Sequence, residues 1–236
     1  MMTLRRLSYS LCAIAAIVIT TSRTTATPLT PPGDDPIPIS TIENCPPEGR
    51  GGDSLLNKLK NRTDAPIESA VQPKGYDFFV AMAGKEPKKW WTNQNRDPLK
   101  AEGEGLPVQF EGYLLKVKHY PKGKDVCNCN LPLERNNDFE LVLGKDLKSP
   151  EKTSITAEMS PRTRLTTHLG WTFDKLQQIA GKNKKIRVAG WLLYDSETKD
   201  KGKKGRLTRW EIHPITKFEV QQDDGSWKTL DDLRTN

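Results

Sequence analysis

The order of alternating segments in the second half of the chain is the feature that most restricts its fold. Apolar and polar residues alternate at 108–117, 139–143 and 155–159, which predicts three strands. A short amphipathic helix is predicted next, at 172–180. Two further strands are expected, at 186–194 and at 207–221, the last continuing beyond a proline. Helices do not alternate with strands in this order, so a doubly wound α/β fold is excluded.

Two glycines lie inside predicted strands and indicate where those strands bend. Gly112 stands where the apolar positions of the first strand change phase, and Gly190 lies inside the fourth strand. An OB-fold is a small Greek-key barrel whose bent first strand serves both halves, with its helix after the third strand. We therefore predict a mainly β protein with an OB-fold-like five-stranded barrel over residues 108–222. A β-sandwich is the alternative.

The N-terminus has the pattern of a secretory signal peptide. Arg5 and Arg6 precede an apolar run at 11–19, and small residues end at Ala26, which predicts a signal at 1–26. A short uncleaved anchor is the alternative, but no apolar run reaches the ~18 residues that a membrane span needs. Removing the signal lowers the net charge from +7 to +4, which favours acidic partners only weakly. We expect a secreted or periplasmic protein.

The remaining regions are predicted from composition. Prolines crowd the segment 27–52, which we interpret as an extended linker. An irregular N-terminal extension follows at 53–107, with one short helix capped by Asp53 or Ser54. Residues 223–236 are expected to form a C-terminal tail.

Three cysteines remain after export, and they predict one disulfide. Cys45 is expected to pair with Cys127 or Cys129, because a bond between those two close neighbours would be strained. The alternatives are free thiols, or a metal site formed by Cys127, Cys129 and His119. The local sequence offers no fourth ligand, so we predict neither a metal nor a cofactor.

Several segments resemble a group of exported bacterial proteins of unassigned function. The most specific are Val-Ala-Gly-Trp-Leu-Leu-Tyr-Asp-Ser-Glu at 188–197 and Trp-Glu-Ile-His-Pro-Ile-Thr at 210–216. Residues 56–62, 111–114 and 159–162 are similar to further signatures of the group. The resemblance implies an OB-like fold and export, and it implies no activity.

His213 is the best single candidate for chemistry. Glu211 lies two residues away, on the same face of an extended strand, and could orient the imidazole for acid–base work. With Glu158 and Arg162 nearby, a site that cleaves phosphodiesters can be imagined. The simpler interpretation is that His213 hydrogen-bonds a neighbour. We therefore assign no catalytic residue and favour a protein that is not an enzyme.

One further observation supports the structural interpretation of this region. In the group that the chain resembles, a histidine often follows an aspartate–aromatic pair, whereas this chain has Asp138-Phe139-Glu140. That departure argues against a histidine-based site. In the structural interpretation Glu211 pairs with an arginine, either Arg209 or Arg187.

A basic loop joins the fourth and fifth predicted strands. Its candidate ligand-binding residues are Lys199, Lys201, Lys203, Lys204, Arg206 and Arg209. OB-folds use this loop for oligonucleotides and sugars, and basic residues there would neutralise phosphates. An ordinary solvated turn is the alternative.

Three classes of function therefore compete. A binding module for a polyanion or a protein comes first, a structural envelope-associated protein second, and a nuclease-like phosphodiesterase third. The chain has no Ser-His-Asp order, phosphate loop, metalloprotease motif or complete zinc quartet. We expect a monomer whose partner is a polyanion or an envelope protein.

Overall fold

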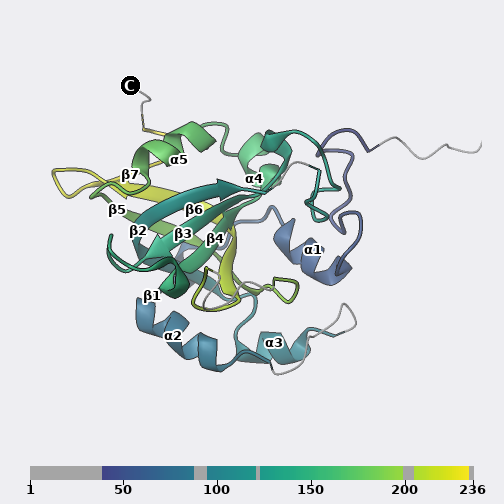
Figure 1. Cartoon of the computed structure of the whole chain (residues 1–236), viewed down its shortest axis with the longest axis horizontal. Coiled ribbons are helices and arrows are strands. Elements are labelled where there is room, and N and C mark those ends of the chain that lie inside the picture. Colours follow the sequence, from purple (N-terminus) through teal and green to yellow (C-terminus); the bar gives the residue numbers. More distant parts are fainter. Residues whose placement is uncertain (1–38, 88–94, 121–122, 199–204, 234–236) are drawn as a thin grey trace, which may run out of the picture. The chain divides into compact units, whose positions relative to one another are not determined.

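The alternating segments form a closed barrel of five strands in the computed structural model, which describes residues 39–87, 95–120, 123–198 and 205–233 (Figure 1). The barrel strands are β2 (Pro107–His119), β3 (Phe139–Gly144), β4 (Ile155–Met159), β5 (Lys185–Tyr194) and β6 (Trp210–Gln221). They pair in the order β2–β3–β4–β6–β5, and β5 pairs again with β2 to close the barrel. Only the β4–β6 contact among these is parallel. The predicted mainly β, OB-like fold is confirmed.

The long strand β2 serves both halves of the barrel, as its central glycine predicted. Residues 107–113 pair with β5, and residues 113–119 pair with β3. A Cβ atom on Gly112 would lie 2.5 Å from the carbonyl oxygen of Gly144, so only glycine allows this close approach. At Gly190 the register between β5 and β6 shifts, and a Cβ there would lie 2.3 Å from the Pro214 oxygen. Both glycines therefore stand where the strands coil.

The helix predicted between the third and fourth barrel strands is α5 (Phe173–Ile179). The side-chain oxygen of Thr172 accepts a hydrogen bond from the Lys175 amide, which confirms the predicted cap. The helix predicted after Asp53 is α1 (Ser54–Lys60), and Asp53 caps it by accepting from the amides of Leu55 and Leu56. Short polar caps thus set both helix starts.

The N-terminal extension and the C-terminal tail are more ordered than the sequence predicted. In these two regions the additional elements are β1 (Gln72–Lys74), α2 (Tyr76–Gly84), α3 (Asp97–Glu102), β7 (Trp227–Thr229) and the 3-10 turn Glu68–Ala70. Between the barrel strands lie α4 (Pro161–Thr166) and the 3-10 turns Glu134–Asn136 and Glu151–Thr153. β1 pairs with β2, and β7 pairs with β6, so both outer segments extend the sheet. The barrel strands run from Pro107 to Gln221, and β1 and β7 add to the same sheet from either side of that range.

Helices surround the barrel on several sides. Figure 1 shows α4 and α5 on one side of the strands and α2 and α3 on the opposite side. Phe79 and Met82 of α2 join the barrel core, where the Phe79 and Phe110 rings meet edge to face at 5.8 Å. α1 packs against β6. Within the described residues, no helix has both the length and the apolar character needed to cross a bilayer.

Candidate functional site

Buried charged side chains gather on the outer side of β4 and β6, beneath α1. Ala157 and Ile212, which pair across these two strands, belong to the hydrophobic core. Because side chains alternate along a strand, Glu158, Glu211 and His213 point to the other side of the sheet. These three side chains belong to a group of buried charged residues under α1, the β2–β3 loop and the β5–β6 loop, which we call the ionic cluster. Its members are Lys60, Asp125, Asp138, Glu158, Asp195, Arg206, Glu211 and His213.

His213 lies at the centre of the carboxylates of the ionic cluster and is 1% exposed. Its Nδ1 is 3.1 Å from Glu211 Oε1 and 3.3 Å from Glu158 Oε2. Its Nε2 is 3.7 Å from Asp138 Oδ2 and has no hydrogen-bond partner among the described residues. The predicted neighbours Glu211 and Glu158 are therefore correct, and Asp138 is a third.

Lys60 and Asp195 form a buried ion pair at one edge of the cluster. The Lys60 Nζ is 3.0 Å from Asp195 Oδ2, and the two side chains are only 11% and 8% exposed. Burial alone would raise the pKa of Asp195, but Lys60 and Arg206 lower it to about 2. Burial would likewise lower the pKa of Lys60, but Asp195, Glu211 and Glu158 raise it well above its ordinary value. Both groups are therefore charged at neutral pH.

Arg206 belongs to the ionic cluster rather than to an exposed basic loop. Its Nη1 is 2.7 Å from Glu211 Oε2, and its Nη2 is 3.9 Å from Glu158 Oε1. The side chain is 7% exposed, so the prediction that Arg206 binds an external ligand is not supported by its position. The expected partners of Glu211 also differ, since Arg187 pairs with Glu111 and Arg209 donates to the Tyr194 hydroxyl. Arg206 takes their place, and its two neighbours Gly205 and Leu207 are held by hydrogen bonds with Ser154, which directly precedes β4.

The cluster contains more buried acidic groups than basic ones. Five carboxylates face two side-chain cations and one histidine. Burial and the neighbouring Asp125 raise the pKa of Asp138 to about 6, and burial and Glu211 raise the pKa of Glu158 well above its ordinary value. Acidic groups therefore outnumber basic ones here, and the raised pKa values mean that the cluster favours uptake of a proton or a cation.

A small cavity of about 70 Å³ opens beside the cluster, between the two loops that OB-folds use for ligands. Tyr120, Lys124, Asp125 and Cys127 line it from the β2–β3 loop, and Asp195, Glu197 and Thr198 line it from the β5–β6 loop. Lys60, Asp138 and Glu158 complete the polar part of the wall. Ligand pockets for small molecules span ~300–1,000 Å³, so this cavity fits water or an ion rather than a nucleotide.

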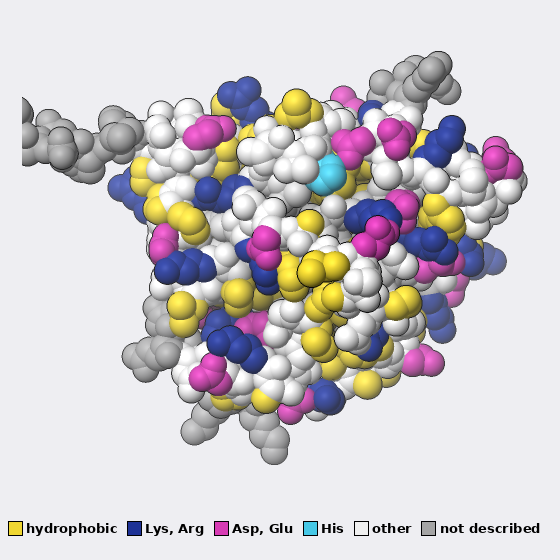
Figure 2. Space-filling view, turned by 180° about the vertical axis from the view of Figure 1, so that it is seen from behind, with side chains coloured by type: hydrophobic (Ala, Val, Ile, Leu, Met, Phe, Trp, Pro, Cys, Tyr) yellow, Lys and Arg dark blue, Asp and Glu magenta, His cyan; other side chains and the backbone are white. Residues whose placement is uncertain are grey.

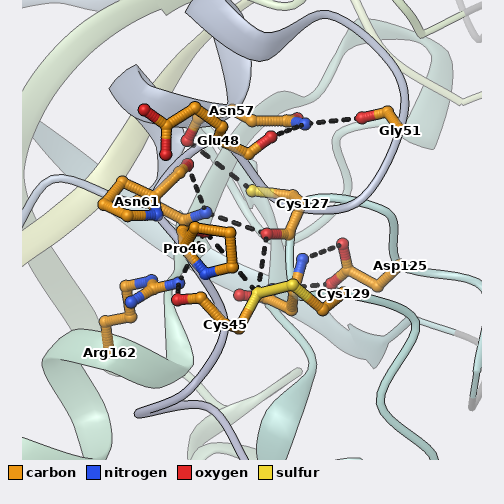
Figure 3. The surroundings of a disulfide bond; sticks show 12 residues. Cys45, Pro46, Glu48, Gly51, Asn57, Asn61, Asp125, Cys127, Cys129 and Arg162 are labelled. Carbon is orange, nitrogen blue, oxygen red and sulfur yellow. Dashed lines mark hydrogen bonds between the residues drawn. A yellow bond between two sulfur atoms is a disulfide. The ribbon is translucent and has the colours of Figure 1, made fainter. Parts of the chain in front are cut away.

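A disulfide fastens the segment that covers the cluster. Cys45 is bonded to Cys129, which confirms the predicted link between the N-terminal segment and the barrel (Figure 3). Cys127 is a buried free thiol, and Figure 3 shows its sulfur directed toward Asn57 of α1. Asn61 of α1 donates to the Cys127 carbonyl oxygen at 2.8 Å. The disulfide and α1 thus hold the β2–β3 loop from two sides.

Other predicted site residues lie elsewhere. Arg162 has other partners, because its Nη2 donates to the carbonyl oxygens of Cys45 and Pro46. His119 lies 3.7 Å from Glu134, so it does not join the cysteines. The signal peptide, residues 27–38 of the proline-rich linker and Lys199, Lys201, Lys203 and Lys204 lie outside the described residues.

Lys60, Asp138 and Asp195 were not predicted as site residues. For two of them the sequence position was informative, since Asp138 directly precedes the strand β3 and Asp195 directly follows the strand β5. Two sets of donor atoms in this region lie close enough to share a metal ion, each within 4.8 Å: Asp125, Cys127 and Asp138, and Asp138, Glu158 and His213. Asp138 is common to both sets.

The fold and this region define an OB-like barrel with a buried ionic cluster beside its β2–β3 and β5–β6 loops. No family model matches the sequence, and no curated protein matches it. Among solved structures, the chain is similar to Entamoeba histolytica asparaginyl-tRNA synthetase in complex with asparaginyl-adenylate, at 11% identity and a TM-score of 0.33. The similarity covers 66% of this chain and 24% of that protein, so the chain spans about a quarter of its length.

Proposed function

We propose that this chain is an exported OB-like binding module, of the group that it resembles, and that it binds a polyanion through the β5–β6 loop. The meeting of the β2–β3 and β5–β6 loops at one cavity carries the proposal, because OB-folds bind oligonucleotides and sugars with these loops. The exposed Lys124 belongs to the first loop, and four lysines between 199 and 204 belong to the second. The cavity excludes a nucleotide by its size, so a polymer would lie across the loops.

The rest of the described surface offers less support for polyanion binding than the loops do. Figure 2 shows one face on which Lys and Arg side chains are interspersed with Asp and Glu. On that face the described residues form no broad basic area. His213 is too deeply buried for a phosphodiester to reach it, so we do not propose a nuclease. A structural envelope-associated role remains the alternative.

Replacing Lys199, Lys201, Lys203 and Lys204 by Gln is expected to weaken binding to heparin and DNA. Each lysine that contacts a phosphate contributes about one unit to the slope of log affinity against log salt, so the slope should flatten accordingly. Retention on both polymers at several salt concentrations measures this. Arg206 stays unchanged because it pairs with Glu211.

The matched control replaces four lysines elsewhere, Lys145, Lys148, Lys182 and Lys228, all exposed, by Gln. It makes the same change in net charge away from the two loops. We expect the retention of this control to be closer to that of the parent than the retention of the loop variant is. Equal retention of the loop variant, the control and the parent would show the loop to be a solvated turn and would contradict polyanion binding there.

Export is a separate part of the proposal and has its own test. The charged and apolar N-terminal pattern supports it, and the Cys45–Cys129 disulfide is compatible with an oxidising compartment. Protein secreted or released from the cell envelope is expected to begin near Thr27 on N-terminal sequencing. Native protein that keeps Met1 and stays in the cytoplasm would contradict export.

A further inference from the structure

His213 has one ring nitrogen fixed by a carboxylate and the other facing a carboxylate without a hydrogen bond. Nδ1 lies 3.1 Å from Glu211 Oε1, a distance at which its N–H donates to that carboxylate. Nε2 then presents its lone pair. It is buried 3.7 Å from Asp138 Oδ2, and no described residue forms a hydrogen bond with it. Two acceptors facing each other repel, so this gap favours a positive group between them.

The distances around this gap match the size of a coordination sphere. One donor atom each from Asp138, Glu158 and His213 lie within 4.8 Å of one another, and all three residues are buried. Two ligands about 2.1 Å from a tetrahedral ion are about 3.4 Å apart, longer than a hydrogen bond and close to the observed 3.7 Å separation. The geometry is therefore that of ligands around an ion rather than of a direct hydrogen bond.

We propose that Asp138, Glu158 and His213 bind a divalent transition-metal ion, with Glu211 orienting His213 from behind. A carboxylate that accepts from the other ring nitrogen is the usual partner of a metal-binding histidine. Imidazole with carboxylate donors suits Zn²⁺ or Mn²⁺.

Charge and access also fit this site. The ionic cluster has five carboxylates against Lys60 and Arg206, and a divalent ion would offset most of the excess. Asp138 and Glu158 line the cavity of about 70 Å³, which gives an ion a route and leaves room for water as a fourth ligand. The site does not depend on polyanion binding by the loop.

The test uses the mature chain with its disulfide intact, stripped with EDTA and then dialysed against Zn²⁺ or Mn²⁺ alone. We expect one bound equivalent per chain and a higher melting temperature with metal. His213→Gln and Asp138→Asn should each bind at least tenfold more weakly. His119→Gln, which changes a half-exposed histidine outside the cluster, should bind as the parent does.

Cys127→Ser distinguishes this site from the neighbouring set of Asp125, Cys127 and Asp138. It should leave metal binding unchanged, and loss of binding in this variant would overturn the proposal. So would the absence of stoichiometric binding, or parent-like binding by a folded His213→Gln.

A measurement on the parent covers the case in which the buried variants do not fold. The chain has three histidines, so their ring nitrogen resonances can be assigned and followed during a Zn²⁺ titration. The proposal expects the His213 resonances to shift with one equivalent while those of His119 and His168 do not. An unchanged His213 signal at saturating Zn²⁺ would overturn it.

Discussion

Lys60→Met is expected to destabilise the folded chain by about 3–5 kcal/mol, as is typical when one partner of a buried ion pair is removed. Methionine can fill much of the space of the lysine side chain but leaves Asp195 charged, buried and without its cation. It also removes one of the two cations of the ionic cluster. Urea unfolding at pH 7, compared with the parent, measures the loss.

The same helix provides a matched control. Lys58 pairs with Glu48 at 2.8 Å, but the two side chains are 50% and 43% exposed. Exposed pairs contribute ~0–1 kcal/mol, so Lys58→Met should change the free energy of unfolding by less than about 1 kcal/mol. Similar small losses in both variants would show that the Lys60–Asp195 pair contributes little.

The pH dependence separates charge from packing in this pair. The pKa of Asp195 is about 2 in the folded chain, below its ordinary value of 3.8, so the unfolded chain takes up the proton first as the pH falls. The contribution of the Lys60–Asp195 pair to the free energy of unfolding is therefore fully present above pH ~4 and is lost as the pH falls toward 2. Asp195→Asn should be less stable than the parent at pH 7, and the difference should shrink across that interval.

The barrel could be predicted from the sequence because its signals are local. Strand alternation, Gly112, Gly190 and the Thr172 cap each depend on a few neighbouring residues. α2 was missed for the opposite reason. Phe78, Phe79 and Val80 are consecutive apolar residues without helical spacing. The helix packs through Phe79, which is buried against Phe110 of the barrel, and this contact is distant in the sequence.

The ionic cluster could be predicted only in part. Glu211 and His213 share one face of a strand, which the sequence shows directly. Arg206 looked like one more basic residue of a lysine-rich loop, and only the structure shows that it pairs with Glu211. Lys60 reaches the same place from a helix 135 residues before its partner Asp195. Such long-range pairing leaves no local pattern.

Four of the five segments in which the sequence predicts a resemblance to exported bacterial proteins contain or adjoin members of this cluster. Residues 56–62 form most of α1 and include Lys60, and residues 210–216 supply Glu211 and His213. Residues 159–162 directly follow Glu158, and 188–197 include Asp195. The fifth segment, 111–114, lies in β2 and supplies no member of the cluster.

Replacing Cys45 and Cys129 together by Ser is expected to cost about 4 kcal/mol of stability. The bond joins residues 84 apart in the sequence, and in the chain-entropy model a loop of that length constrains the unfolded chain strongly. Its removal also frees the segment that positions α1 over the ionic cluster. Urea unfolding of the variant and of the oxidised parent measures the loss, and peptide mapping without reduction should find Cys45 joined to Cys129.

The remaining cysteine gives the control for this prediction. Cys127→Ala removes a buried thiol but keeps the disulfide, so it should cost about 1 kcal/mol, the usual effect of a single substitution. Because the disulfide holds the cover of the cluster, the double variant should also expose Lys60 more readily to amine-modifying reagents, whereas Cys127→Ala should not. A double variant as stable as the parent would mean that α1 and the hydrogen bonds of Asn57 and Asn61 hold the N-terminal segment without the covalent bond.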